Sequence, residues 1–271
     1  MTEAKVFERY LSILGVDAAP PSLDHLSALV RAQLTRIPFE NISKLYLKKT
    51  QGASYIPSLE QHLDGIDRFG FGGTCYANNP YFYDLLRFLD FEVILCGADM
   101  SRPNVHVVSM VDLEDRQYLV DVGYGAPFYE PMARDLDRPQ EIRFGSNRFV
   151  LHPQDGRGRS RMDHFHDGEL IHGYTAKPEA RRIDDFDEVI RESYEESATF
   201  MNVLVVERFL PGRSLRIHNF SLTESTPEGA TTTRLGDREE LAATVERYIG
   251  IPAGIVREST ANLALQAEIY S

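Results

Sequence analysis

Residues 104–125 read NVHVVSMVDLEDRQYLVDVGYG, two runs of β-branched and aromatic residues joined by a short acidic segment. Such a pattern predicts a β-hairpin. If Leu113 and Glu114 form its turn, His106 lies directly opposite Asp121 on one face of the sheet. A turn longer by two residues makes the two side chains diagonal neighbours, and a slip of one residue puts them on opposite faces. The hairpin therefore predicts a His–Asp pair whose contact depends on register.

The segments around the hairpin change character along the chain. The early patterns are mostly helical, and SLDHLSALVRAQLTRI begins with Ser22 as a candidate N-cap and is ended by Pro38. Most segments from 91 to 195 alternate with a period of two, as strands do. Helical patterns return at 237–250 and 259–270. We expect an α+β protein with a helical first third, a β-rich middle and a mixed last third.

The bulk composition restricts the classes of function. The chain has 271 residues and a formal net charge of −12, with 42% hydrophobic and 26% charged residues. Nucleic-acid binders normally carry a basic surface, so we expect no nucleic-acid partner, and a polyphosphate ligand must be held by local donors. We expect no membrane partner, because no long apolar run is present. The opening MTEAKVFERY does not resemble a secretory signal and two cysteines make no disulfide framework, which predicts a cytoplasmic protein.

A candidate nucleophile lies before the hairpin, in the stretch GFGGTCYANN at 70–79. Cys75 follows two glycines at the start of a predicted helix, although Pro80 predicts a kink or a later start of that helix. A helix N-terminus and a nearby imidazolium both favour a thiolate. With Asp121 orienting His106, the three residues can act as nucleophile, base and orienting acid. Each residue alone is compatible with plain packing, and it is the combination that favours catalysis.

A second group of titratable residues lies in the segment MDHFHDGELIHG. Its members are His164, His166, His172, Asp163 and Asp167. Zinc sites use such ligands, but these lie near a polar loop and no cysteine joins them. We therefore expect no metal site.

Several segments together resemble the arylamine N-acetyltransferase family. The family motif R-G-G-x-C-x-E-x-N matches FGGTCYANN, and the family segments P-F-E-N, H-V and D-V-G-[FY]-G recur in the family's order and spacing. The later segment SATFMNVLVVERF resembles the region where the family's third domain begins. The matching positions are Pro38, Phe39, Glu40, Asn41, Gly72, Gly73, Cys75, Asn79, His106, Val107 and 121–125.

The resemblance implies a fold of three regions around a cysteine-protease-like Cys-His-Asp core. These are a helical bundle over 1–90 with the nucleophile, a β-barrel over 91–195 with the His and Asp, and an α/β lid over 196–271. It also implies ping-pong acyl transfer from acetyl-CoA, a cosubstrate, to an arylamine, arylhydrazine or arylhydroxylamine, with no permanently bound cofactor. Cys75 is then the nucleophile, His106 moves protons and Asp121 holds His106. The oligomeric state is not predicted.

Substrate contacts follow from the same resemblance. The turn after Asp121 lets backbone amides approach an acyl oxygen or the CoA pyrophosphate. The residues expected to bind the cosubstrate there are Gly123, Tyr124 and Gly125. The aromatic residues expected near the acceptor are Phe39, Tyr124 and Phe200. The arginines available for the CoA 3′-phosphate are Arg134, Arg138 and Arg148.

The chain departs from the family motif at two positions. The motif's Arg is Phe71 and its Glu is Ala77. The paired loss avoids a stranded buried charge, and Arg36 or Arg68 is expected to take the place of the missing cation beside Glu40. These departures bring the acyl donor and the substrate range into question.

Three other functions use the same residues. One is an amide synthase or other acyltransferase of this family that takes its acyl group from a donor other than acetyl-CoA, such as a carrier protein. Another is a cysteine hydrolase of the papain or transglutaminase type, which detectable thioesterase or peptidase turnover would reveal. The last is a binding protein that keeps the fold, whose thiol would show ordinary reactivity.

Overall fold

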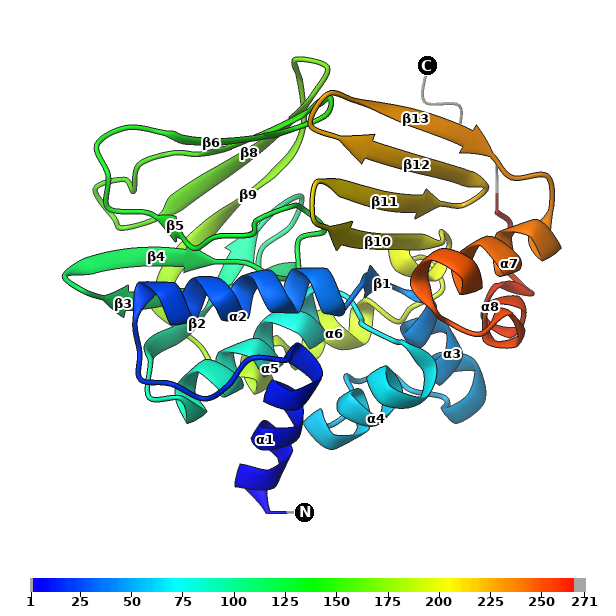
Figure 1. The fold of residues 1–271 in the computed structure, drawn as a ribbon, viewed down its shortest axis with the longest axis horizontal. Helices are drawn as coiled ribbons and strands as arrows, with labels where there is room; N and C mark the ends of the chain where they lie inside the picture. The colour runs from blue at the N-terminus through cyan, green and yellow to red at the C-terminus, as the bar shows by residue number, and fades with distance from the viewer. Residues whose placement is uncertain (1, 266–271) are drawn as a thin grey trace.

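Two antiparallel sheets and the helices packed around them form the molecule (Figure 1). The computed structural model describes residues 2–265. The helices are α1 (Glu3–Leu14), α2 (Leu23–Arg36), α3 (Ile42–Gln51), α4 (Leu59–Phe69), α5 (Cys75–Phe88), α6 (Asp187–Glu192), α7 (Arg238–Ile249) and α8 (Ala253–Thr260), with short 3-10 turns η1 (Ile183–Phe186) and η2 (Thr199–Met201). The strands are β1 (Phe39–Glu40), β2 (Glu92–Asp99), β3 (His106–Leu113), β4 (Arg116–Val120), β5 (Met132–Ala133), β6 (Gln140–Phe144), β7 (Asn147–Leu151), β8 (Ser160–His166), β9 (Glu169–Ala180), β10 (Val205–Leu210), β11 (Arg213–His218), β12 (Ser221–Thr226) and β13 (Gly229–Arg234).

The larger sheet has eight strands in the order β5-β4-β3-β2-β9-β8-β7-β6 and curves into a nearly closed barrel (Figure 1). The smaller sheet has five strands in the order β1-β10-β11-β12-β13. Its edge strand β1 comes from the helical part of the chain, since Phe39 pairs with Glu207 and Glu40 with Val206. The mixed fold agrees with the α+β expectation. The division into three units at 90 and 195 stays a prediction.

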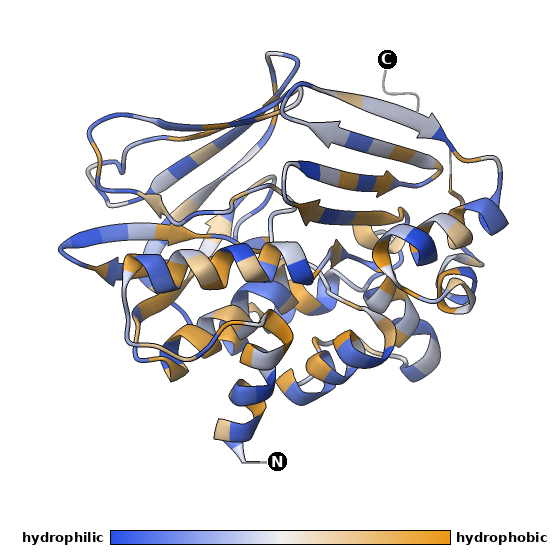
Figure 2. Cartoon of the chain, in the orientation of Figure 1, coloured by the Kyte–Doolittle hydropathy of each residue, from blue (hydrophilic) through white to orange (hydrophobic). Residues whose placement is uncertain are grey.

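The nucleophile helix α5 packs between the other helices and the barrel. Its buried residues join α1, α2 and strands β2, β3 and β4 in the largest hydrophobic core. Figure 2 shows hydrophobic residues along much of α5 and α1, as expected for helices that bury a broad face. A second core lies between the smaller sheet, α7 and α8. Because α5 is held by the larger core, its N-terminus has a fixed position beside β3.

The β3–β4 hairpin forms, but its turn differs from the expected one. Leu113 pairs with Arg116, so the turn residues are Glu114 and Asp115 rather than Leu113 and Glu114. Both turn residues have positive φ values, 54° and 61°. Two-residue hairpin turns favour positive φ at both positions, and Asp tolerates this conformation better than Leu. The register prediction was therefore wrong, but the shift is even, so His106 and Asp121 remain on one face.

Pro80 predicted either a kink or a later start of the nucleophile helix; the later start was wrong, because the helix begins at Cys75. The amides of Ala77 and Asn78 both donate to the Thr74 carbonyl at 3.0 Å, which closes the first turn before Pro80 is reached. The helix then continues through Pro80 to Phe88. Thr74 itself is extended, as N-cap residues are.

Other predicted helix boundaries agree more closely. Ser22 caps α2, its hydroxyl oxygen accepting the His25 amide at 3.1 Å, and α2 ends at Arg36, two residues before Pro38. The helix predicted over 237–250 is α7. The helix predicted over 259–270 overlaps only the end of α8; residues 261–265 are not helical, and 266–270 lie outside the described residues.

Candidate active site

Cys75 is presented by a tight turn, residues 71–74, called here the nucleophile turn. A side chain at Gly72 would place its Cβ 1.7 Å from the Pro38 carbonyl oxygen, so only glycine fits there. Gly73 has a φ of +114°, a conformation that side-chain-bearing residues rarely adopt. Cys75 follows as the first residue of α5 and is 8% exposed. Its thiol lies at the positive end of the helix dipole.

The buried carboxyl group of Glu40 stabilises the nucleophile turn through hydrogen bonds. Its Oε1 accepts the Gly72 amide at 2.9 Å and its Oε2 accepts the Ser43 amide at 2.8 Å. Its own amide donates to the Gly73 carbonyl at 3.1 Å. Burial raises the pKa of Glu40 above its ordinary value. Backbone amides thus satisfy this carboxyl group.

The expected replacement of the motif's cation by another arginine was wrong. The Arg36 guanidinium donates to the Ile13 carbonyl at 3.3 Å. Arg68 lies over the ring of Phe69, 4.9 Å from its centroid. In the described part of the chain neither of them pairs with Glu40. With Phe71 in place of the motif's Arg, the Glu40 carboxyl group is satisfied by hydrogen bonds from the backbone amides of Gly72 and Ser43.

His106 and Asp121 form a buried pair beside Cys75. His106 Nε2 lies 2.8 Å from Asp121 Oδ2, and the side chains are 2% and 0% exposed. His106 begins β3 and Asp121 directly follows β4, which is why the hairpin brings them together. The ring of Tyr174 packs against His106 with centroids 4.9 Å apart and shields the pair from solvent. The His–Asp contact predicted from the hairpin is thus present.

The electrostatics of the pair favour an imidazolium. Burial opposes the charged ring, but the adjacent Asp121 carboxylate and a hydrogen bond with the Cys75 side chain outweigh it and raise the pKa of His106 to about 10. Burial likewise opposes the Asp121 carboxylate, but His106, Asn79 and the Gly123 amide together lower the pKa of Asp121. An imidazolium between a carboxylate and a thiol can stabilise a thiolate and later donate a proton.

Asn79 links the nucleophile helix to this pair. Its Nδ2 donates to Asp121 Oδ1 at 2.9 Å and to the Val107 carbonyl at 2.7 Å. Its Oδ1 accepts the Val122 amide at 2.9 Å. Sequence reasoning matched Asn79 to the family motif without giving it a role. The signal that could have found one is its i, i+4 spacing from Cys75, which puts both on one face of α5.

The turn after Asp121 approaches the nucleophile closely. A Cβ at Gly123 would lie 2.8 Å from Cys75 Cα and 2.7 Å from Asn79 Nδ2. The Gly123 amide donates to Asp121 Oδ1 at 3.0 Å, so it is used inside the site. Gly125 has a φ of +75° and lies next to the Phe39 ring. The binding of CoA by this turn stays a prediction, and the Gly123 amide already has a partner within the pair.

The three aromatic residues expected near the acceptor lie in two groups. Phe39 and Phe200 make an edge-to-face contact with centroids 6.0 Å apart. Tyr124 packs against His106, 5.8 Å between centroids, and its hydroxyl group lies 2.7 Å from His172 Nδ1. Their role in acceptor binding stays a prediction.

The arginines considered for the CoA 3′-phosphate differ in accessibility. Arg134 is buried, and its guanidinium donates to Ser160, Gln117 and Gly158 within the barrel, so it is not available. Arg148 pairs with Glu141 at 3.2 Å and stacks on the Phe165 ring. Arg138 is exposed. Of the three, Arg138 therefore suits an incoming phosphate best.

The histidines considered as metal ligands have other contacts. His164 Nε2 and His166 Nδ1 both lie near Asn147 Oδ1, at 2.8 and 3.1 Å, and His172 contacts Tyr124. Within residues 2–265 no group of three His, Cys, Asp or Glu residues could hold a metal ion. The helices described there also include none long and apolar enough to span a membrane.

Sequence reasoning missed one charged residue near the nucleophile. Lys44 on α3 is only 8% exposed, and its Nζ donates to Ser193 Oγ at 2.6 Å and lies 4.0 Å from the Tyr194 ring centroid. Burial lowers the pKa of Lys44 to about 8, against the opposing effect of Cys75. Lys44 lies between Ile42 and Leu45, two apolar residues that α3 buries, and this sequence position could have indicated that Lys44 is buried as well.

Comparisons with known proteins show which family the chain resembles. A family model described as N-acetyltransferase matches residues 22–256. Arylamine N-acetyltransferase 2 of Mesocricetus auratus is 26% identical over 231 residues, which cover 82% of this chain and 68% of that protein. Arylamine N-acetyltransferase 1 of the same species is 30% identical over 147 residues, 49% of each. The chain thus spans about half the length of several curated relatives that it matches.

Solved structures share the fold. The arylamine N-acetyltransferase from Salmonella typhimurium superposes with a TM-score of 0.79 at 22% identity, covering 96% of this chain and 99% of that one. That from Mycobacterium marinum in complex with CoA has a TM-score of 0.79 at 20% identity, covering 93% and 97%. The family model covers most of the chain, and the relatives and the fold agree with it: the chain belongs to the arylamine N-acetyltransferase family.

Proposed function

We propose that the protein transfers an acetyl group from acetyl-CoA to an arylamine, arylhydrazine or arylhydroxylamine through a thioester on Cys75. The observation that carries the proposal is the buried His106–Asp121 pair, 2.8 Å between nitrogen and oxygen, beside Cys75 at the start of α5. This arrangement suits nucleophilic catalysis by cysteine. The names of the family's members and the CoA complex of one structural relative support the donor and the acceptor class.

In the first half-reaction the Cys75 thiolate attacks the carbonyl carbon of the acetyl thioester. A C–S bond to Cys75 forms, the C–S bond to CoA breaks, and the His106 imidazolium gives its proton to the departing CoA thiolate. Asp121 keeps His106 oriented and stabilises its charged form. The product is an acetyl-cysteine beside a neutral imidazole.

In the second half-reaction the neutral amine nitrogen attacks the acetyl carbonyl carbon. The Cys75 thiolate leaves, and His106 takes up the proton released by the amine, which restores the starting state. A poorly basic aryl amine suits this step because it stays neutral and nucleophilic near neutral pH. Phe39, Phe200 and Tyr124 offer aromatic faces for its ring, and Phe200 belongs to the proposed lid over 196–271.

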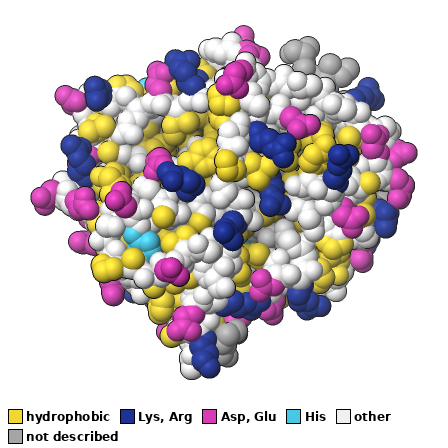
Figure 3. Space-filling model, in the orientation of Figure 1, with side chains coloured by type: hydrophobic (Ala, Val, Ile, Leu, Met, Phe, Trp, Pro, Cys, Tyr) yellow, Lys and Arg dark blue, Asp and Glu magenta, His cyan; other side chains and the backbone are white. Residues whose placement is uncertain are grey.

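The polyphosphate of CoA needs local cations in a chain of net charge −12. Figure 3 shows several Lys and Arg side chains near the middle of one face, beside hydrophobic ones, whereas acidic side chains are most frequent toward its edges. Such a surface can accept a ligand with an anionic end and an apolar end. The exposed Arg138 is one candidate for the 3′-phosphate.

The test is to incubate the protein with acetyl-CoA in the absence of an acceptor and to record intact mass and free CoA. The expected result is one added acetyl group and one equivalent of CoA. Cys75→Ser should gain none, whereas Cys96→Ser, which changes a buried cysteine on β2, should react like wild type. If wild type stays unmodified while Cys75 still alkylates selectively, the acetyl donor is wrong and a carrier-bound or longer acyl donor takes its place.

A further inference from the structure

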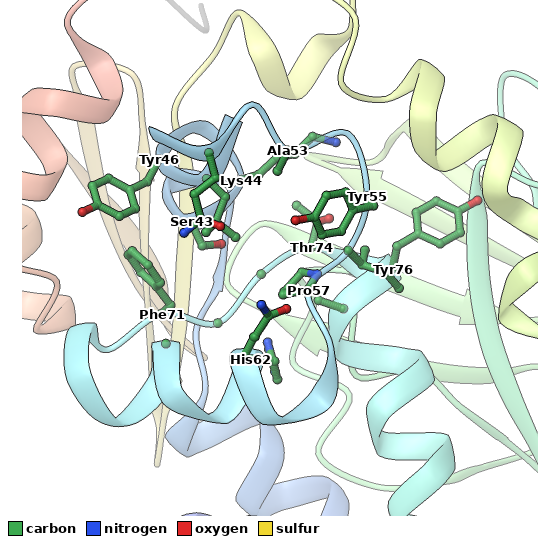
Figure 4. Close-up of a pocket in the computed structure, with 18 of the residues that line it drawn as sticks. Ser43, Lys44, Tyr46, Ala53, Tyr55, Pro57, His62, Phe71, Thr74 and Tyr76 are labelled. Carbon is green, nitrogen blue, oxygen red and sulfur yellow. The ribbon is translucent and has the colours of Figure 1, made fainter. Parts of the chain in front are cut away.

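A cavity of ≈ 200 Å³ lies against the nucleophile turn, lined by residues of α3, α4, α5, the segment 53–57 and the end of α6 (Figure 4). We call it the rear cavity, because Cys75 is not among the residues that line it. The nucleophile turn and Ala77 form one wall. It is therefore a space distinct from the His106–Asp121 pair but in contact with the backbone that positions Cys75.

The rear cavity contains a buried cation without a carboxylate partner. Figure 4 shows Lys44 extending from α3 on one side of the cavity, with His62 of α4 on the other. An ammonium group has three N–H donors. One reaches Ser193 Oγ and the group also lies against the Tyr194 ring, but within residues 2–265 Lys44 forms no ion pair with a carboxylate, and the charge that acts on it is that of an ionised Cys75. A buried charge of this kind favours an anion supplied by a ligand.

The other charged groups around the rear cavity do not supply that anion. Asp64 pairs with Arg9 at 2.7 Å and is half-exposed. Arg68 is a second cation and lies over the Phe69 ring. The buried His62 Nε2 has no hydrogen-bond partner within the described residues. Among the lining residues, the two cations Lys44 and Arg68 thus face one carboxylate, Asp64, which is already paired with Arg9.

Aromatic and other apolar residues form much of the remaining wall, together with polar side chains such as Ser43, Gln61 and Thr74. Figure 4 shows Tyr46 and Phe71 at one end and Tyr55 at the other. Phe71 and Ala77 stand where the family motif has Arg and Glu, so two charged side chains are replaced by an aromatic and a small apolar one at this wall. A cavity of about 150 Å³ holds benzene in another protein, so one of ≈ 200 Å³ has room for one ring with a small substituent.

We propose that the rear cavity binds a small monocarboxylate with an apolar body of about one ring, its carboxylate held by the Lys44 ammonium. The largely apolar walls favour a singly charged carboxylate over a phosphate, because a dianion loses more hydration on burial. The proposal does not depend on acyl transfer, since Cys75, His106 and Asp121 do not line the cavity, although Cys75 acts electrostatically on Lys44.

The first experiment measures binding of benzoate to the full chain by isothermal titration, with benzamide as the neutral isostere. Benzoate should bind saturably, and benzamide at least about ten-fold more weakly, because it lacks the charge that Lys44 requires. Lys44→Met should lose at least about ten-fold in benzoate affinity. Lys48→Met, which removes a charge on the same helix outside the cavity, should bind like wild type.

Lys44→Met is expected to fold. Met replaces a buried cation by an apolar side chain of similar length, and the Ser193 hydroxyl group still donates to the Ile190 carbonyl. A second measurement needs no variant: reductive methylation of wild type followed by peptide mass spectrometry. Benzoate should slow methylation of Lys44 and leave that of Lys48 and Lys49 unchanged.

Three results would overturn the proposal. They are equal affinity of benzoate for wild type and Lys44→Met, equal affinity of benzoate and benzamide, and failure of benzoate to protect Lys44. Cys75→Ser separates this proposal from the proposed function, because it should bind benzoate like wild type although it cannot be acetylated. Loss of binding in Cys75→Ser would place benzoate at the nucleophile and contradict the assignment to the rear cavity.

Discussion

Asn79 ties the helix that begins with Cys75 to the carboxylate of Asp121. Its Nδ2 lies 2.9 Å from Asp121 Oδ1, while its Oδ1 accepts the amide of Val122 at 2.9 Å. Asn79 is 1% exposed, so water cannot replace these bonds. One amide side chain therefore fixes both the helix and the strand end relative to each other. This makes Asn79 a positioning residue for the pair of His106 and Asp121.

Replacing Asn79 by Ala should loosen the site. The change leaves the buried Val122 amide without its acceptor and costs about 2 kcal/mol of unfolding free energy. Cys75 acetylation should slow by about ten-fold or more, because the His–Asp pair loses its connection to the nucleophile helix. Urea unfolding and single-turnover acetylation measure the two effects.

The matched control is Asn78→Ala on the same helix. Asn78 is also buried, but it contacts the Gly73 carbonyl and Gln33 and not Asp121. It should lose similar stability and keep the pH profile of Cys75 alkylation, which Asn79→Ala should change. Identical profiles for the two variants would reduce Asn79 to a structural role.

Asp121→Asn should remove the charge that keeps His106 protonated. The substitution preserves size, but the pKa of His106 should fall from about 10, because the carboxylate is what outweighs burial. The Cys75 sulfur then loses its cationic partner during attack, and acetylation should slow by about 10²-fold to 10⁴-fold. The His106 ring resonances followed by NMR titration report the pKa. An unchanged titration would show that Asp121 does not control His106.

The pH dependence of wild type should show a late alkaline decline. His106 keeps its proton up to about pH 10, so the imidazolium that protonates the CoA thiolate is present through neutral and mildly alkaline pH. Acetylation of Cys75 should fall as pH rises through that value, when His106 becomes neutral. Single-turnover rates with circular dichroism at each pH separate this decline from unfolding. A decline already centred near 6.5 would mean an ordinary histidine.

The hairpin shows which features of the site could be predicted from sequence patterns. Alternating residues predicted both strands and placed His106 and Asp121 on one face, and this outcome survived an error in the turn because the register shift was even. The turn itself was misassigned because a two-residue hairpin turn needs positive φ at both positions, which Asp115 adopts more readily than Leu113. The contact was therefore predictable from periodicity, whereas its exact register was not.

The contacts that complete the site join residues far apart in the chain. Glu40 reaches Gly72, Asn79 reaches Asp121, and Lys44 reaches Ser193. The local sequence pattern around either residue does not predict such pairs, because each pair depends on how the helices pack on the barrel. The resemblance to a family indicated that Asn79 belongs to the motif, but only packing gives it a partner.

Gly123→Ala should impair the site by steric contact alone. A Cβ at Gly123 would meet Cys75 Cα at 2.8 Å and Asn79 Nδ2 at 2.7 Å, so the turn or the helix must shift. Acetylation should slow by about ten-fold or more, since misplacement of about 1 Å is costly in catalysis. Gly254→Ala is the control: a Cβ there meets nothing within 4 Å, and stability should rise by about 0.5 to 1 kcal/mol. Full activity of Gly123→Ala would contradict this prediction, because it would show that the turn can shift without disturbing Cys75.

Lys44→Met should change how stability depends on pH. Burial lowers the pKa of Lys44 to about 8 from 10.5, so the folded state releases a proton that the unfolded state keeps between these values. Below about pH 8, burying the protonated Lys44 lowers the unfolding free energy of wild type by its full amount. This destabilisation disappears as pH rises toward 10.5, because the folded protein then holds Lys44 in its neutral form. Relative to Lys44→Met, wild type should therefore gain up to about 3 kcal/mol across that range.

Denaturant unfolding of both proteins at matched pH values measures this difference. His106 titrates in the same range, but it is present in both proteins and its contribution cancels on subtraction. Lys48→Met should follow the wild-type curve, because Lys48 lies outside the rear cavity. Parallel curves for wild type and Lys44→Met would mean that the Lys44 ammonium is solvated in solution. The cavity would then lack the buried cation on which carboxylate binding depends.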